Sequence, residues 1–207
     1  GIIYHPLNIA EGLKRVVGGV AYTEEDLVTQ AGLIHSWQHH SRFSGSDRDE
    51  VLRTINDRLS EAASFLKQSR FLILSPATAF AYYLKEDNRL VANCHKIPAS
   101  SFTKRMSTVE EIVKELGDAL EEVKKFNRNV RFIFTVSPVK HLRDGVVANN
   151  LSKAVVLQAV HRLVEQFAGS WYFPSFEILN DELRDYRFYK PDFAHPTESA
   201  VDYILKK

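Results

Sequence analysis

The sequence is poor in the residues that build disulfide and metal frameworks. Its 207 residues contain a single cysteine, Cys94, so an internal disulfide bond cannot form. A lone thiol is compatible with a reducing compartment, and we interpret Cys94 as a buried apolar residue. The sequence also lacks a phosphate-binding loop and a G-x-G-x-x-G fingerprint, the usual signals of a nucleotide site. We therefore expect no cofactor.

Long apolar runs and an excess of one charge are missing as well. No apolar stretch reaches the roughly 18 residues of a membrane span, and the chain does not open like a secretory signal peptide. Lysine and arginine number 27 against 26 for aspartate and glutamate, giving a formal net charge of +1. Such a chain has no strong field to attract nucleic acid or an anionic membrane. We expect a cytoplasmic protein with neither partner, and the sequence leaves its oligomeric state open.

What the sequence does have is the composition of an ordinary globular domain. Hydrophobic residues make up 44% of it and charged residues 26%, which are typical values. A chain of this length can bury a sizeable core without a disulfide or a metal. Because domains average roughly 100–200 residues, we expect one domain over residues 1–207.

Hydrophobic periodicity predicts buried strands that alternate with amphipathic helices. Continuous apolar runs at 71–74 and 130–136 are typical of strands buried on both faces, and a third strand is expected at 171–173. Strands separated by helices of ten or more residues imply a parallel sheet with helices on both faces. The predicted helices cover 6–18, 47–66, 108–126, 147–167 and 196–205, with a short helix at 23–26, a hairpin over 79–94 and an irregular loop over 32–46.

Asp192 and His195, which precede the last predicted helix, are the leading catalytic candidates. Sites in parallel sheets lie at the carboxyl ends of the strands. An aspartate three residues before a histidine can reach the ring Nδ1, orient the ring and stabilise its charge, so that the other nitrogen acts as a general base. Pro196 fits the first helical position, which places His195 at or beside the helix N-cap. The alternative is that Asp192 only caps the helix and His195 is a polar loop residue.

Three further side chains are candidates for the substrate side of the site. The amide N–H of Asn93 could stabilise an oxyanion. Ser137 follows the second buried strand, and with His141 it could suggest a nucleophile and its base. Because Ser137 lacks the glycines of a nucleophile elbow, we expect this loop to shape the site or contact substrate. His40 belongs to a histidine cluster with His35 and His39, of which one member is expected to border the pocket.

Two groups of polar residues receive plainer interpretations. A helical pair of histidines among His35, His39 and His40 could bind zinc, but no H-E-x-x-H pattern accompanies them, and we expect no metal. A metal-dependent hydrolase nevertheless stays an alternative. Ser152 and Lys153 lie in the helix over 147–167 and are interpreted as surface residues.

Four stretches of the chain match a known family. They cover residues 1–9, 91–96, 134–139 and 184–189 and run the length of the chain. By their order and spacing the sequence resembles the GSCFA family, a branch that looks related to the SGNH/GDSL hydrolases. The resemblance implies a three-layer α/β/α fold of SGNH-hydrolase or flavodoxin-like type, with a mainly parallel sheet.

The resemblance also implies an activity, namely ester hydrolysis or acyl transfer on a small-molecule or carbohydrate-linked ester. Asp192 and His195 would then supply acid and base, and Asn93 would help form the oxyanion hole. Two positions depart from the family pattern, because Ala77 stands where Gly-Thr is frequent and His5 stands where asparagine is frequent.

The motif that names the family, Gly-Ser-Cys-Phe-Ala, does not occur in residues 1–207. Its serine would be the nucleophile. Because the match begins at residue 1, in an apolar and strand-like segment over 1–4, the resemblance implies that the motif and the first strand lie upstream of an N-terminally truncated domain. A triad without its nucleophile loses covalent turnover. The alternative function is a non-catalytic binding or interaction domain that retains the hydrolase fold.

Overall fold

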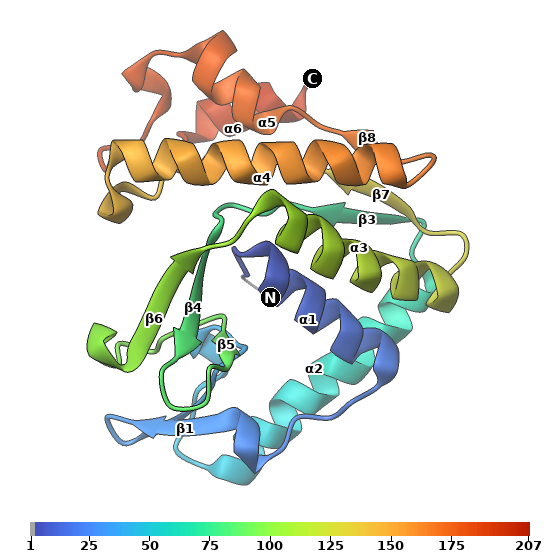
Figure 1. The fold of residues 1–207 in the computed structure, drawn as a ribbon, viewed down its shortest axis with the longest axis vertical. Helices are drawn as coiled ribbons and strands as arrows, with labels where there is room; N and C mark the ends of the chain where they lie inside the picture. The colour runs from blue at the N-terminus through green and yellow to red at the C-terminus, as the bar shows by residue number, and fades with distance from the viewer. Residues whose placement is uncertain (1–2) are drawn as a thin grey trace.

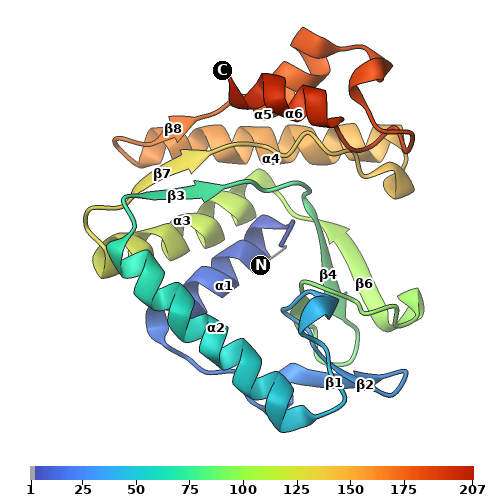
Figure 2. The same ribbon diagram turned by 180° about the vertical axis from the view of Figure 1, so that it is seen from behind.

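The computed structural model describes residues 3–207 and shows a mixed α/β structure (Figures 1 and 2). The strand expected over 1–4 falls partly on residues 1 and 2, which lie outside the described part, and Ile3 and Tyr4 are not in a strand. The long helices are α1 (Pro6–Gly18), α2 (Arg48–Gln68), α3 (Val109–Phe126) and α4 (Val146–Gln166), and two short ones are α5 (Ser175–Glu177) and α6 (Glu198–Leu205). None of the described helices is long and apolar enough to cross a membrane.

A parallel sheet forms the centre of the structure, as predicted. Its strands are β3 (Phe71–Leu74), β7 (Arg131–Phe134) and β8 (Trp171–Tyr172), in the order β3-β7-β8. Both pairings are parallel, and Leu74 lies opposite Phe134 in the register. The carboxyl ends of β3 and β7 therefore meet at one edge, which is where a parallel sheet places a site.

One face of this sheet carries the main core. Leu74, Phe132 and Phe134 point to that face and are buried together with apolar residues of α3 and α4. Figure 2 shows the strands passing in front of these two helices. The apolar side of α3, which the sequence predicted, packs on the sheet, and α4 packs on the same face through Val156, Ala159, Val160 and Leu163.

The opposite face of the sheet is open. Phe71 and Ile73 are 49% and 66% exposed, and Trp171 is 44% exposed. The register puts Ile73, Ile133 and Trp171 side by side on this face. The prediction that residues 71–74 are buried on both faces is therefore wrong, because the side chains of Phe71 and Ile73 stay largely exposed on this face. A second helical layer is not seen over these side chains.

Short antiparallel strands form a separate lobe below the parallel sheet in Figure 1. The predicted hairpin is present as β4 (Phe80–Leu84) and β5 (Leu90–Val91), and β6 (Phe102–Met106) adds to β4. The irregular loop expected over 32–46 is wrong in part, because β1 (Leu27–Gln30) and β2 (Leu33–Ser36) form a second hairpin. Ala31 and Gly32 both have positive φ in its two-residue turn, the geometry that suits a tight hairpin.

The helix ends follow the capping rules, with small shifts from the predictions. Gly19 ends α1 in the left-handed conformation, and Asp47 caps α2 by accepting the Glu50 N–H. The Ser-x-x-Glu spacing of residues 107–110 predicts Ser107 as the cap of α3, but the cap is Thr108, with Glu111 completing the capping box. Short helical turns cover Glu24–Asp26, Ser41–Phe43, Ala99–Ser101, Leu142–Asp144, Ile178–Leu183 and Tyr186–Phe188.

The cap of α1 is the buried side chain of His5. Its Nδ1 accepts the Leu7 N–H at 3.1 Å, so the ring proton is on Nε2, which donates to the Ala79 carbonyl at 3.1 Å. Burial is the main cause that lowers the pKa of His5 to about 4. The folded state therefore needs a neutral ring, because a proton on Nδ1 would break the cap.

We expect the His5→Asn variant to be less sensitive to acid than the wild type. Between pH 6.5 and 4 the unfolded His5 binds a proton that the folded one does not, so its stabilisation is complete above 6.5 and is lost as the pH falls. The slope is about 1.4 kcal/mol per pH unit for one proton. Asparagine retains a cap acceptor and does not titrate. Urea unfolding at pH 7, 5.5 and 4.5 measures the difference, and equal acid sensitivity in both proteins would refute the assignment.

Candidate active site

Asp192 and His195 form a hydrogen-bonded pair, as the sequence predicted. Asp192 Oδ2 lies 2.6 Å from His195 Nδ1, while Oδ1 accepts the backbone N–H of Ala194 at 2.9 Å and that of His195 at 3.0 Å. The two backbone hydrogen bonds and the ring contact hold the pKa of Asp192 at about 2. A carboxylate at Nδ1 fixes the ring tautomer and directs Nε2 outward. Within residues 3–207, Nε2 of His195 has no hydrogen-bond partner.

The turn that carries this pair is tightly held. The His195 carbonyl accepts the Lys190 N–H at 2.8 Å, and the Ala194 carbonyl accepts the Lys140 N–H at 3.2 Å. Phe193, between the paired residues, has a φ of 56° and is 56% exposed. A bulky residue in the left-handed region is strained and is retained only where the surroundings impose it.

The prediction that the last helix begins at Pro196 is wrong. The helix α6 begins at Glu198, and its N-cap is Thr197, which accepts the Ala200 N–H. Pro196 instead pairs with Tyr189 in an isolated antiparallel bridge. His195 therefore lies two residues before the cap, so its orientation is set by Asp192 and not by the helix terminus.

A cavity of about 570 Å³ opens between α1, α2 and the carboxyl end of β3. Its walls are apolar side chains of the three elements, including Leu13, Leu59 and Ile73. Its polar rim includes His40 and Ser137, two of the predicted site residues, which the fold brings to one cavity. A pocket of this size with an apolar wall and a few polar groups is typical of small-molecule sites.

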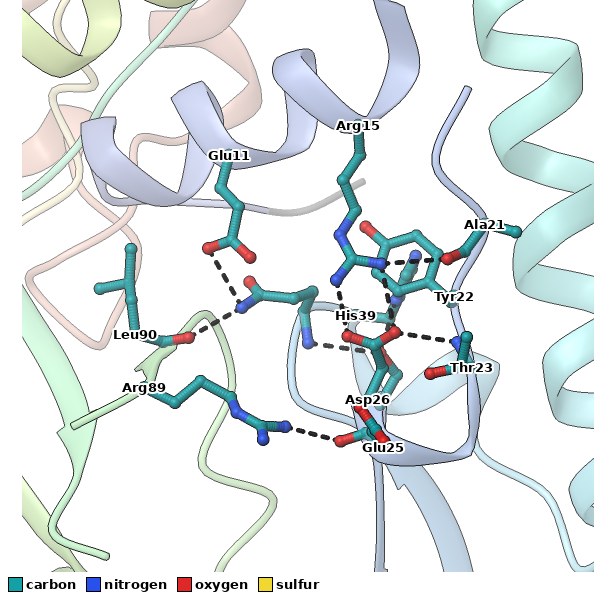
Figure 3. Close-up of polar contacts among 12 residues, drawn as sticks. Glu11, Arg15, Ala21, Tyr22, Thr23, Glu25, Asp26, His39, Arg89 and Leu90 are labelled. Carbon is teal, nitrogen blue, oxygen red and sulfur yellow. Dashed lines mark hydrogen bonds and ion pairs between the residues drawn. The ribbon is translucent and has the colours of Figure 1, made fainter. Parts of the chain in front are cut away.

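A polar network behind this rim fixes the loop that carries His39 and His40 (Figure 3). Arg15 of α1 makes a two-point ion pair with Asp26, at 2.7 and 3.2 Å, and its guanidinium lies 4.1 Å from the Tyr22 ring centroid. The Tyr22 ring packs against His39 with centroids 4.7 Å apart. Burial lowers the pKa of His39 to about 4 and raises that of Tyr22 to about 12. The loop is therefore tied to α1 by neutral rings and a paired charge.

Asn93 lies in the antiparallel lobe and is not among the residues that line the cavity. Its Oδ1 accepts the His95 N–H at 3.0 Å, and its own N–H donates to the Trp37 carbonyl at 3.1 Å. His95 has a φ of 48°, so the Asn93 side chain stabilises a strained turn. The role of the Asn93 side-chain amide as an oxyanion donor stays a prediction.

The histidine cluster does not converge on one point. Nδ1 of His35 bonds Ser44 Oγ at 2.5 Å, and Nδ1 of His39 bonds Ser36 Oγ at 2.8 Å. His40 uses its Nδ1 to cap a short helix by accepting the Arg42 N–H. The described residues contain no group of three or more potential ligands placed to hold a metal ion.

The interpretation of Ser152 and Lys153 as surface residues is wrong. Both are buried, at 3% and 2% exposure, and so is Asn149. These polar residues continue the buried face of α4, whose apolar members are Val156, Ala159, Val160 and Leu163. The spacing of that face, extended by two turns toward the N-terminus, predicts positions 149, 152 and 153, a signal that the polar character of the residues hid.

A comparison with models of known protein families gives a match over the whole chain. The model described as the GSCFA family matches residues 1–207, from the first residue to the last. No curated protein and no solved structure matches the chain.

Proposed function

We propose, from the premise that this chain belongs to the GSCFA family, that it carries the acid–base pair of a serine ester hydrolase or acyltransferase of SGNH type. The observation that carries the proposal is the 2.6 Å contact between Asp192 Oδ2 and His195 Nδ1. The contact is a short hydrogen bond to the carboxylate of Asp192, and hydrogen bonds to an ionised acceptor are stronger than neutral ones. His195 Nε2 is then the base.

The nucleophilic serine, in this proposal, follows a further strand that pairs with β3. Two features support such a strand. Within the described residues β3 pairs only with β7, so its other edge presents unpaired backbone N–H and C=O groups to which a further strand could add. The apolar part of the cavity, between α1, α2 and β3, lies beside that edge and includes Ile73 and Leu74 in its lining.

The chemistry proceeds in two displacements. His195 Nε2 removes the proton from the serine hydroxyl as Oγ attacks the ester carbonyl, and the protonated ring then gives that proton to the departing alcohol. Water, or an acceptor alcohol in acyl transfer, repeats the sequence on the acyl-enzyme and restores the serine. Asp192 stays ionised throughout and stabilises the imidazolium. His40 and Ser137 on the cavity rim are the proposed contacts to a small or carbohydrate-linked ester, and Asn93 is the proposed oxyanion donor.

The proposal is tested on the natural polypeptide, expressed from its own start. We expect it to hydrolyse an aryl acetate and to be labelled by a fluorophosphonate on one serine, with both signals unaffected by a chelator. Loss of turnover with EDTA would favour the metal-dependent alternative. A folded protein that neither hydrolyses the ester nor takes the label contradicts the hydrolase assignment and favours the non-catalytic binding domain. The alanine at position 77, where the family pattern often has Gly-Thr, supports that alternative.

A further inference from the structure

Lys153 is buried in a way that apolar packing does not explain. Its side chain is 2% exposed and ranks among the largest of the fully buried side chains. None of the ion pairs within residues 3–207 involves its ammonium group. Because an unpaired buried charge is costly, a position that only filled space would favour leucine or methionine. We therefore expect the ammonium group of Lys153 to make specific polar interactions.

The ammonium group joins two turns that lead away from the sheet. Lys153 Nζ donates to the carbonyl of Ala77 and to that of Ser137, each at 2.6 Å. Ala77 follows β3 and Ser137 follows β7, and these strands are neighbours in the parallel sheet. The Ser137 N–H also donates to the Pro76 carbonyl at 3.0 Å. Lys153 thus braces a pair of turns that already touch each other.

Two neighbours on the same face of α4 hold the same turns. Ser152 Oγ accepts the Ala79 N–H at 2.7 Å and bonds Thr78 Oγ1 at 3.0 Å. Asn149 Oδ1 accepts the His141 N–H at 2.8 Å, at the far end of the turn after β7. The buried polar face of α4 therefore contacts both turns at successive points.

These turns lead directly to the candidate site. Ala77 and Ser137 line the 570 Å³ cavity. Three residues beyond Ser137, the Lys140 N–H donates to the carbonyl of Ala194, inside the turn that orients His195. A displacement of Ser137 would therefore shift both the cavity rim and the support of the Asp192–His195 turn.

We propose that Lys153 is a positioning residue of this site, which fixes the turns after β3 and β7 relative to each other and, through residues 137–141, to the Asp192–His195 turn. The proposal rests on the proposed function for its catalytic consequence, while its structural part stands alone. Burial lowers the pKa of Lys153 to about 7. A neutral amine still has N–H donors for both carbonyls, so the brace persists when the proton is lost.

The test replaces Lys153 by methionine, which is similar in length and has no donor. In residues 1–207 we expect amide hydrogen exchange at Ala77 and Ser137 to become at least about tenfold faster, with the amides of α3 unchanged. In the natural polypeptide we expect kcat for an aryl acetate to fall on the order of 10²-fold, as for other small misplacements, with KM changed less than about twofold. Lys125→Met, which removes an exposed lysine of α3, is the matched control and should change neither quantity.

Each outcome decides the proposal. Unchanged exchange at both turns overturns it, whatever the activity. Faster exchange with an unchanged kcat per folded molecule overturns the positioning role and leaves Lys153 a structural residue only. If the wild type has no hydrolase activity, the proposed function fails, and the exchange experiment alone then tests the brace. If the methionine variant does not fold, Lys153→Gln, which retains a shorter donor, is measured in the same way.

Discussion

In the hydrolase proposed above, replacing His195 by alanine should lower kcat for ester hydrolysis by roughly 10⁴- to 10⁶-fold, with the fold intact. Asp192 orients this ring through its Nδ1, and in the proposed hydrolase the serine hydroxyl would have no base without it. The His195 side chain is 56% exposed, so its loss removes little packing. Initial rates with an aryl acetate give kcat and KM, and circular dichroism checks the fold.

Asp192→Asn separates orientation from base strength in the same experiment. The asparagine can still accept the backbone N–H groups of Ala194 and His195 through one oxygen. It cannot stabilise an imidazolium as a carboxylate does, and a drop of up to about 10⁴-fold follows in triads of this kind. Because the Asp192 side chain is 49% exposed, water weakens its effect and we expect the smaller end of that range.

His161→Ala, which changes an exposed residue of α4, is the control for both variants. A rate of the His195→Ala variant within tenfold of the wild-type rate would rule out His195 as the base.

Phe134→Ala should cost about 3–5 kcal/mol of the free energy of unfolding of residues 1–207. Phe134 is fully buried at the end of β7, with its ring centroid 6.1 Å from that of Phe132. The truncation leaves a cavity between the sheet and the α3–α4 layer, where close packing prevents full collapse. The residue also precedes the turn that leads to Ser137. In the variant, the backbone amides of this turn should therefore exchange with solvent faster through local opening, without global unfolding.

Phe65→Ala is the matched control for that experiment. Phe65 lies on α2 and is 78% exposed, so the same chemical change should alter stability by less than about 0.5 kcal/mol. Urea denaturation of both variants and the wild type gives the comparison. Similar losses in the two variants would show that the core does not lie between β7 and the α3–α4 layer.

The long helices could be predicted because their information is local. The apolar spacing of α1, α2 and α3 and the cap at Asp47 lie within a few residues of sequence. The Asp192–His195 contact is local in the same sense, since three residues separate its partners. Physical rules of short range were therefore sufficient for these features.

The remaining features depend on contacts between distant residues. Strand β2 forms because it pairs with β1. Residues 33–36 alone do not show the alternation of apolar and polar residues that would predict a strand. The exposure of Phe71 and Ile73 depends on what lies over the sheet, which an apolar run does not reveal. The contacts of the Lys153 ammonium group cannot be predicted in this way, because its two acceptors lie 76 and 16 residues away in sequence.

The left-handed backbone at Phe193 also limits how this site can vary in evolution. Glycine and asparagine adopt that conformation at low cost, whereas β-branched residues do so at the highest cost. A mutation at position 193 therefore affects mainly the backbone conformation of the turn between Asp192 and His195. Its effect on the exposed side chain is of less consequence. Sequence drift at position 193 is thus restricted by a torsion angle, even though the side chain itself is largely free of neighbours.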